Sequence, residues 1–479
     1  MSTNRIAALA AAATLCIPAA GCGTPPDRGR MVLYDVTLID GTGDAARSGM
    51  VVAIAGDRID AVLPVADFTA RRTDSIVVAS GLYAIPGLWD LHVHLSTATA
   101  DALPVLIANG VSSVRDMGGV LADLRAWRAN VEAGLRIGPR IFMAGPMLEA
   151  PVTLERIAGK ATSERYWETR IPVPDTVHAR LVVDSLAALG VDFIKIREYA
   201  SGETYRAIVE AASARGLAVA GHAPFSMDPV EGASLGVVSF EHASYPYPLP
   251  DVGPKRTAIL SAFRTSGVAI VPTLVAWETN VMYPDSLRLL AADSTGTRDP
   301  RRRLIAPHLA AEWRKDIEEI GPRATNYYAG YWGFIERMSR DLKAMHDAGI
   351  PLLAGSDLSG PGLFPGFALH DELERMVEWI GLTPEDVLVA ATRRSAELLG
   401  AADSLGTVEV NKLADLVLLE ADPLLDIRNT RRIHAVVARG KLIGPARIRE
   451  LLHGLAPTTK GNIVLSRRLR SSARLENRN

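Results

Sequence analysis

The chain has 479 residues, of which 48% are hydrophobic and 22% are charged, and its formal net charge is −2. This length is sufficient for an α/β barrel, which needs about 250 residues, together with a smaller domain. The near-neutral charge and the lack of a long basic stripe with interleaved aromatic residues argue against a nucleic-acid-binding protein and favour a small-molecule partner.

The first thirty residues are typical of an export segment. After Arg5, the apolar stretch 6–20 is too short to span a membrane with its flanks and predicts a signal peptide over 1–21. The small residues directly before Cys22 resemble a bacterial lipoprotein processing site, so we expect lipidation of Cys22 and a tether over 22–30. Acyl chains would then hold an exported lipoprotein at a membrane of the cell envelope. A plain signal peptide with an incidental cysteine is the alternative.

Both ends of the remaining chain predict a small β domain. Alternating or β-branched runs at 31–40 and 51–62 precede the central region, and similar runs at 414–419 and 433–439 follow it. We infer a composite β-sandwich-like domain from 31–80 and 405–458. The arginine-rich end, 459–479, is interpreted as a solvated or disordered basic tail.

The central region, 81–404, reads as a (β/α)8 barrel in an α/β fold. Helix-like segments such as 174–189, 202–215 and 331–348 alternate with short apolar runs, as such a barrel requires. The eight predicted strands are 85–92, 111–116, 140–144, 191–196, 217–222, 237–242, 269–274 and 351–357.

Two histidines lie at the end of the first predicted barrel strand. Because side chains alternate along a strand, His92 and His94 point the same way and can bind one cation together. Two imidazoles rarely complete a metal site, so further ligands are expected at other strand ends.

Four later strands also end in residues that can bind a metal. His222, His242 and Asp357 each follow an apolar run, and Lys195 lies near the end of a fourth. An unpaired ammonium at such a buried position is costly, so Lys195 needs a partner or a modification. A structural pair with an acid such as Glu198 is the alternative. The active sites of barrels lie at the carboxyl ends of the strands, and the fold and the ligand positions therefore predict the same face.

With these residues the chain resembles the amidohydrolase superfamily, and the likeness extends over most of the mature chain. The segment 383–424, with TPEDVLVAATRRSAELLG and LGTVEVNKLADLVLLEADPL, is also typical of that family. The chain is most similar to the prolidase-like, Xaa-Arg dipeptidase and imidazolonepropionase-like branch.

The resemblance implies a centre of two divalent metal ions, expected to be zinc. It implies that His92, His94 and Asp357 hold one ion and that His222 and His242 hold the other. Carbamylated Lys195 would bridge the two ions, because carbamylation replaces the buried ammonium with a carboxylate.

Catalytic roles are assigned to three residues. Asp357 is the choice for general base and acid, and His242 or His222 would help to stabilise the intermediate. Tyr199 lies four residues beyond Lys195 and is assigned to orienting the substrate carbonyl, with packing at the barrel rim as the alternative.

Other features near the expected mouth leave alternatives open. His370 is either a substrate contact or a polar residue at a helix start, and the remaining histidines receive no role. Two connections, 145–176 and 276–331, exceed the usual length and are expected to border the pocket. The second is interpreted as a charged helical lid, with binding of an organic acid by its arginines as the alternative.

The leading hypothesis is hydrolysis of an amide in a dipeptide or N-acyl amino acid. Hydrolysis of a cyclic amide, lactone or phosphotriester at the same centre is the alternative, since substrate choice resides in loops. From another class, the chain could be a non-catalytic surface lipoprotein that serves as a binding module. Homo-oligomerisation stays open.

Overall fold

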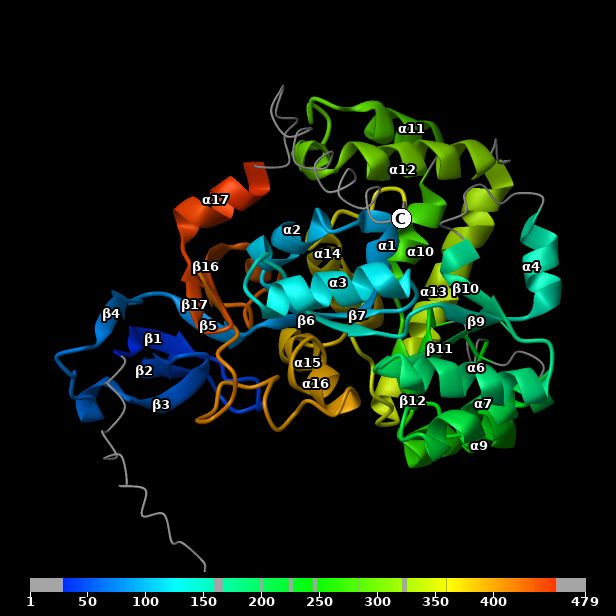
Figure 1. The fold of residues 1–479 in the computed structure, drawn as a ribbon, viewed down its shortest axis with the longest axis horizontal. Coiled ribbons are helices and arrows are strands. Elements are labelled where there is room, and N and C mark those ends of the chain that lie inside the picture. The colour runs from blue at the N-terminus through cyan, green and yellow to red at the C-terminus, as the bar shows by residue number, and fades with distance from the viewer. Residues whose placement is uncertain are drawn as a thin grey trace, which may run out of the picture.

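The computed structural model describes residues 29–158, 167–198, 201–223, 227–243, 248–282, 284–320, 325–358 and 360–453. Within them the chain forms a barrel with surrounding helices and, to one side, a sheet domain (Figure 1). The predicted signal peptide, Cys22 and the basic tail lie outside the described residues. Among the residues that the structure describes, no helix is both long and apolar enough to cross a membrane.

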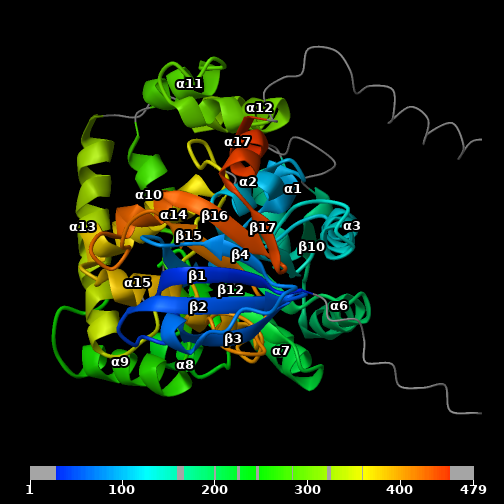
Figure 2. The same cartoon turned by 90° about the vertical axis from the view of Figure 1, so that its left-hand side faces the viewer.

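The sheet domain is built from both ends of the chain, as predicted. The amino-terminal part supplies β1 (Met31–Leu38), β2 (Arg47–Ala55), β3 (Arg58–Pro64), β4 (Ser75–Val78) and β5 (Tyr83–Pro86), with a short helical turn η1 (Val65–Asp67). The carboxyl-terminal part supplies β15 (Leu416–Leu419), β16 (Ile433–Ala438) and β17 (Lys441–Ile443). In Figure 2, β1, β2 and β3 lie near β15, β16 and β17.

The strands of this domain form one mixed eight-stranded sheet. Their order is β17-β16-β15-β5-β1-β2-β3, and β4 pairs in parallel with β1. Apolar residues from both chain ends, such as Leu33, Val52 and Leu416, are buried together on one face of the sheet. This shared core explains why the two ends of the chain, far apart in sequence, form a single domain.

The barrel strands pair in parallel. They are β6 (Leu88–Val93), β7 (Val111–Asp116), β8 (Arg140–Met143), β9 (Met147–Glu149), β10 (Arg170–Pro172), β11 (Phe193–Glu198), β12 (Ala218–Gly221), β13 (Ser239–Glu241) and β14 (Ala269–Val271). Strands β9 and β10 extend the barrel edge next to β11. Their side chains therefore lie beside the carboxyl end of β11.

Backbone hydrogen bonds join the two parts of the barrel sheet. The segment 351–358 accepts from Ile270 N through Pro351 O at 2.9 Å and from Leu91 N through Ala354 O at 3.0 Å. It thus connects β14 with β6. Between β8 and β11, Asp192 N donates to Met143 O at 2.9 Å. These contacts arrange the eight strand positions as the predicted TIM-like barrel.

Helices lie around the barrel and over its mouth. Their bounds are α1 (Leu95–Ala98), α2 (Ala102–Ala108), α3 (Leu121–Glu132), α4 (Pro151–Ala158), α6 (Thr176–Ala188), α7 (Gly202–Ala214), α8 (Pro229–Ala233), α9 (Pro254–Ser266), α10 (Leu274–Val281), α11 (Pro284–Ala292), η2 (Pro300–Leu304), α12 (Pro307–Ile320), α13 (Thr325–Asp347), α14 (Phe367–Arg375), η3 (Met376–Ile380), α15 (Pro384–Ala390), α16 (Arg393–Leu398), η4 (Ile427–Arg431) and α17 (Pro445–His453). Side-chain caps at Asp175, Ser201 and Thr383 bind the free N–H groups at the starts of α6, α7 and α15.

The predicted run 85–92 is not one strand, which corrects the sequence analysis. Residues 83–86 form β5 of the sheet domain, and β6 of the barrel begins at Leu88. Gly87 separates them at a close approach, because a Cβ at this position would lie 2.2 Å from Ser112 Oγ. The last predicted strand, 351–357, makes only isolated bridges to its neighbours.

The long connection 276–331 is largely helical where it is described. It contains the end of α10, then α11, η2 and α12. Helices α11 and α12 lie next to α1 and α10, which follow the carboxyl ends of β6 and β14 (Figure 1). The connection therefore borders the face of the barrel that carries the predicted ligands.

Candidate metal centre

The predicted ligands come from five strand positions of the barrel. His92 and His94 lie at the end of β6, and Lys195 lies within β11. His222 directly follows β12, and His242 directly follows β13. Asp357 ends the segment that connects β14 with β6. Parallel strands bring their carboxyl ends to one face, and these residues therefore converge there.

Asp357 is the centre of the histidine cluster. Its Oδ1 lies 3.5 Å from His92 Nε2 and 3.4 Å from His94 Nε2, and its Oδ2 lies 3.8 Å from His242 Nδ1. His92, His242 and Asp357 offer ligand atoms that all lie within 4.8 Å of one another. The ring of His222 lies 4.8 Å from that of His242, centroid to centroid. The structure thus brings the four predicted histidines and the aspartate together.

Two polar atoms of this cluster are buried and have no hydrogen-bond partner among the described residues. They are His92 Nε2 and Lys195 Nζ. The Lys195 side chain is 1% exposed, and the side chain of Glu198, the alternative partner, lies outside the part of the chain that the structure describes. A buried donor or acceptor without a partner costs about 1–3 kcal/mol, so such atoms call for a ligand. Imidazole nitrogens and a carboxylate are the donors that zinc and related divalent ions prefer, and the residues present fit such ions.

Burial keeps the ligand side chains in forms that can bind a cation. It lowers the pKa of His92 to about 3 and that of His242 to about 4, and it lowers the pKa of His222 as well. These imidazoles are therefore neutral at pH 7. Burial also lowers the pKa of Lys195 to about 8, which makes the neutral amine accessible near physiological pH.

The Nδ1 atoms of three histidines are already engaged. His92 Nδ1 donates to Glu241 Oε2 at 2.8 Å, and His94 Nδ1 donates to Gly118 O at 3.0 Å. His242 Nδ1 lies 2.9 Å from Thr273 Oγ1. These contacts orient the rings and leave each Nε2 for a cation, which is the usual arrangement around a metal-binding histidine.

A buried ion pair below the centre was missed by the sequence analysis. Arg115 Nη2 donates to Glu241 Oε1 at 2.8 Å, and both side chains are fully buried. Arg115 also donates to Ser239 Oγ at 2.8 Å and to Leu91 O at 2.7 Å. This network connects β6, β7 and β13 and holds the carboxylate that orients His92. A charged residue within each of the apolar runs 111–116 and 237–242 was the available signal.

A second buried acid connects the first and last strand positions. Asp90 accepts from Ser356 N at 2.8 Å and from Ser356 Oγ at 2.5 Å. Asp90 lies two residues before His92, and Ser356 lies next to Asp357. The contact therefore fixes the spacing of two metal-binding candidates.

The backbone is in the left-handed region at two predicted ligands. His242 has a φ of 64° and Asp357 a φ of 54°, and Thr273, which contacts His242, has a φ of 49°. Residues other than glycine rarely adopt such angles, and the strain is typical of functional sites.

Two further predicted site residues are not part of the observed cluster. Tyr199 lies outside the described residues. His370 is buried, and its ring nitrogens lie 2.9 Å from Thr430 Oγ1 and 3.0 Å from Asn109 O. Because Asn109 precedes β7, His370 lies towards the amino end of that strand, away from the metal-binding face. Both ring nitrogens thus have protein partners, which favours the alternative of a packed polar residue near the start of α14.

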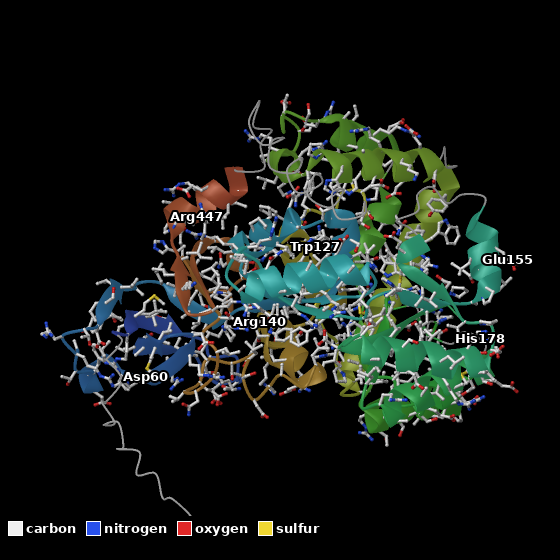
Figure 3. The ribbon with its side chains drawn as sticks, viewed as in Figure 1. Asp60, Trp127, Arg140, Glu155, His178 and Arg447 are labelled. Atoms are coloured by element: carbon white, nitrogen blue, oxygen red, sulfur yellow. The ribbon has the colours of Figure 1, made fainter. Side chains whose placement is uncertain are left out.

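Two arginines of the connection 276–331 already have protein partners. Arg301 is paired with Asp299 and Asp371, and Arg302 donates to Ala291 O. Arg301 lines a cavity of about 450 Å³ beside α10 and α11, and none of the predicted metal ligands lies in that lining. His178 in α6 lies on the outer surface (Figure 3). Its exposed side chain contacts Asp175.

The sequence matches the model of the Amidohydrolase family over residues 83–443. The chain belongs to this family. Members of the amidohydrolase family are metal-dependent hydrolases that act on carbon–nitrogen bonds, in agreement with the donor set at the strand ends.

Known relatives agree with the branch that was predicted. The chain is 24% identical over 400 residues to an imidazolonepropionase from Acidiphilium cryptum, with 81% of this chain and 89% of the relative covered. Among solved structures, a putative prolidase from Bifidobacterium longum is 25% identical with a TM-score of 0.64, and 89% of this chain and 99% of that chain are covered. A Xaa-Pro dipeptidase with bound methionine has a TM-score of 0.64 at 21% identity, with 87% and 100% covered. The prolidase-like and imidazolonepropionase-like resemblance is thereby confirmed.

Proposed function

We propose that this amidohydrolase cleaves the amide bond of a dipeptide or N-acyl amino acid at a binuclear metal centre. The observation that carries the proposal is the convergence of four histidines and Asp357 at one face of the barrel, together with a buried Lys195 whose Nζ has no hydrogen-bond partner among the described residues. A lysine at this place is compatible with its neighbours once it is carbamylated, because the modification replaces an ammonium with a metal-binding carboxylate.

Each predicted ligand has a place in this centre. His92, His94 and Asp357 would hold one zinc ion, and His222 and His242 would hold the other. Carbamylated Lys195 would bridge them. When bound, such ions lower the pKa of a water molecule and polarise a substrate carbonyl.

Asp357 is suited to move the proton of the reaction. Its side chain is 27% exposed, so the carboxylate can be reached from the mouth of the barrel. Burial raises its pKa, but the neighbouring His92 and His242 outweigh that effect and hold the pKa well below its usual value. Asp357 is therefore a carboxylate at pH 7, and it would accept the proton of the attacking water and pass it to the departing amine.

Two supporting roles complete the proposed site. His242 would stabilise the developing charge of the intermediate, since its Nδ1 is held by Thr273 and its ring faces Asp357. Tyr199, four residues beyond Lys195, would orient the substrate carbonyl.

A cyclic amide is the second candidate substrate. The relatives named imidazolonepropionase favour it, because an imidazolone ring contains a ring amide. A dipeptide is favoured by the similar structures named prolidase and Xaa-Pro dipeptidase. Hydrolysis of a dipeptide releases the amine as a separate product. Hydrolysis of a cyclic amide opens the ring and leaves the amine attached to the rest of the product.

We also propose that the enzyme is an exported lipoprotein anchored through Cys22. The apolar stretch 6–20 and the small residues before the cysteine support this proposal. Expression of the full chain and of Cys22→Ala, followed by membrane fractionation, tests it. We expect the variant to leave the membrane fraction, and retention of the variant there would contradict lipidation.

Metal analysis combined with a release assay tests the catalytic proposal. The protein without residues 1–22 is assayed with a panel of dipeptides, N-acyl amino acids and cyclic amides. We expect two metal ions per chain and release of an amine from a subset of the panel. His178→Ala, a change at the exposed outer surface, is the matched control for His242→Ala. Turnover without bound metal would overturn the proposal, and two metal ions with ring opening alone would establish the cyclic amide.

A further inference from the structure

Two arginines surround a buried glutamate beside Lys195. Arg197 Nη1 donates to Glu149 Oε2 at 3.1 Å, and Arg170 Nε lies 3.9 Å from the same oxygen. Glu149 is fully buried. The three residues come from adjacent strands, because β9 pairs with both β10 and β11. Among the described residues, the two arginines thus share contacts with one carboxylate.

The position of Arg197 in β11 directs it to the metal-binding face. Arg197 lies two residues beyond Lys195, so both side chains leave the strand on the same side. Its Cα is about 6.6 Å closer to the carboxyl end of the strand than that of Lys195. Burial lowers the pKa of Lys195 and of His222, and the charge of Arg197 adds to both effects. The guanidinium therefore lies within electrostatic range of the proposed centre.

Part of the Arg197 guanidinium is free to bind a ligand. The side chain is 32% exposed, and within the described chain only Nη1 has a hydrogen-bond partner. Glu149 holds one side of the guanidinium, which fixes its direction. The remaining N–H groups can meet a planar anion, and a carboxylate matches their fork-like geometry.

We propose that Arg197 binds the carboxylate of the substrate and thereby selects N-acyl amino acids and dipeptides with a free carboxyl terminus. This inference rests on the proposed amide hydrolysis. In such substrates the α-carbon alone separates the carboxylate from the scissile nitrogen. The carboxylate therefore lies close to the carbonyl that reacts. This short separation matches that of Arg197 and Lys195, which lie two residues apart in β11. Glu149 is the positioning residue, and Arg170 completes the positive surroundings.

The structural alternative is that the ion pair only attaches β9 and β10 to the barrel. The two roles differ in what a change at Arg197 does to substrate choice. A structural role would lower turnover of all substrates alike, whereas carboxylate binding gives a preference for the acid over its neutral analogue.

The test compares the best substrate of the panel with its carboxyl-terminal carboxamide. In the wild-type enzyme we expect kcat/KM to be roughly 10- to 100-fold higher for the acid than for the carboxamide. This ratio corresponds to the contribution of one charge-assisted hydrogen bond. In Arg197→Met we expect this ratio to fall to within a few-fold of one. Arg197→Lys should give an intermediate ratio, because it keeps the charge but loses the fork.

Arg128→Met is the matched control. Arg128 pairs with Asp192, which precedes β11 at the opposite end of the barrel from the metal-binding face. We expect this variant to keep the wild-type ratio. A wild-type enzyme that cleaves acid and carboxamide equally well would overturn the role of Arg197 and leave amide hydrolysis standing. An enzyme that cleaves neither would instead contradict the proposed function.

Discussion

Two ion pairs, one in the barrel and one in the sheet domain, use the same chemistry for different purposes. In the barrel, Arg115 and Glu241 are fully buried, and Glu241 also contacts His92. In the sheet domain, Arg30 donates to Asp74 at 2.7 Å and to Asp60 at 3.0 Å. Of the two pairs, the first leads to an atom that has no hydrogen-bond partner among the described residues, His92 Nε2.

The difference shows how a functional network can be distinguished from a structural one. A buried ion pair is weak evidence for stability, because the loss of hydration offsets the attraction between the charges. The pair in the sheet domain joins β1, β3 and β4 near their ends and satisfies its own members. The pair in the barrel holds a histidine whose remaining nitrogen is left for a ligand. In this comparison, the ring nitrogen that is left for a ligand distinguishes the two networks, whereas the buried charges do not.

Removing the lysine of the metal centre should have the largest effect. We expect Lys195→Ala to lower turnover by at least about 10³-fold and to reduce bound metal from two ions to one or none, because the bridge is lost. The barrel should stay folded, since the change removes a costly buried group. Elemental analysis, circular dichroism and turnover measure the three quantities. Full metal content in the folded variant would contradict the bridging role.

Removing the proton acceptor should have the next largest effect. We expect Asp357→Asn to lower kcat by roughly 10²- to 10⁴-fold while KM changes by a few-fold at most. Steady-state kinetics at saturating metal separates the two constants. If kcat and KM change in equal proportion, Asp357 acts in binding and not in proton transfer.

A change in the buried network below the centre should act on metal affinity. We expect Glu241→Gln to weaken metal binding by about 10- to 100-fold, because His92 loses the carboxylate that orients it. Competition with a chelator measures this affinity. Asp74→Asn, which removes the corresponding charge in the sheet domain, is the control and should leave metal affinity unchanged. Equal losses of metal affinity in both variants would show that the ion pair in the barrel has no special role in metal binding.

The smallest effect is expected in the sheet domain. We expect Arg30→Met to lower Tm by a few degrees at pH 7 and to leave metal content unchanged. The hydrogen bond from Arg30 lowers the pKa of Asp74 from 3.8 to about 2. Asp74 therefore stabilises the fold above pH 4, and this contribution is lost as the pH falls towards 2. The difference in Tm between the wild-type protein and Arg30→Met should therefore shrink between pH 7 and pH 3, as thermal unfolding would show. A difference in Tm that stays constant over this range would exclude the linkage.

The pattern of the sequence was sufficient for the barrel and for the cluster of side chains at its strand ends. Apolar runs that end in histidine, lysine or aspartate indicate both a strand and the face to which its end belongs. The division at Gly87 was missed, because the apolar run continues from β5 into the start of β6. Only the approach of Ser112 shows why glycine is required.

The residues around the ligands were harder to predict. Arg115 and Glu241 are distant in sequence, and their contact arises only when β7 and β13 face each other across the barrel. The position of His370 shows the converse. Its nearness in sequence to Asp357 suggested the mouth, whereas its partners Asn109 and Thr430 come from other parts of the chain. Local patterns predict strand ends, but they do not predict which side chains meet between strands.

The central place of β5 in the sheet has a consequence for folding. It pairs with β1 on one side and with β15 on the other, and β15 is made only after the whole barrel. A growing chain therefore exposes the unpaired edge of β5 until synthesis is almost finished, and such an edge can pair with another chain. We expect chains truncated before Leu416 to aggregate even though the barrel strands are complete.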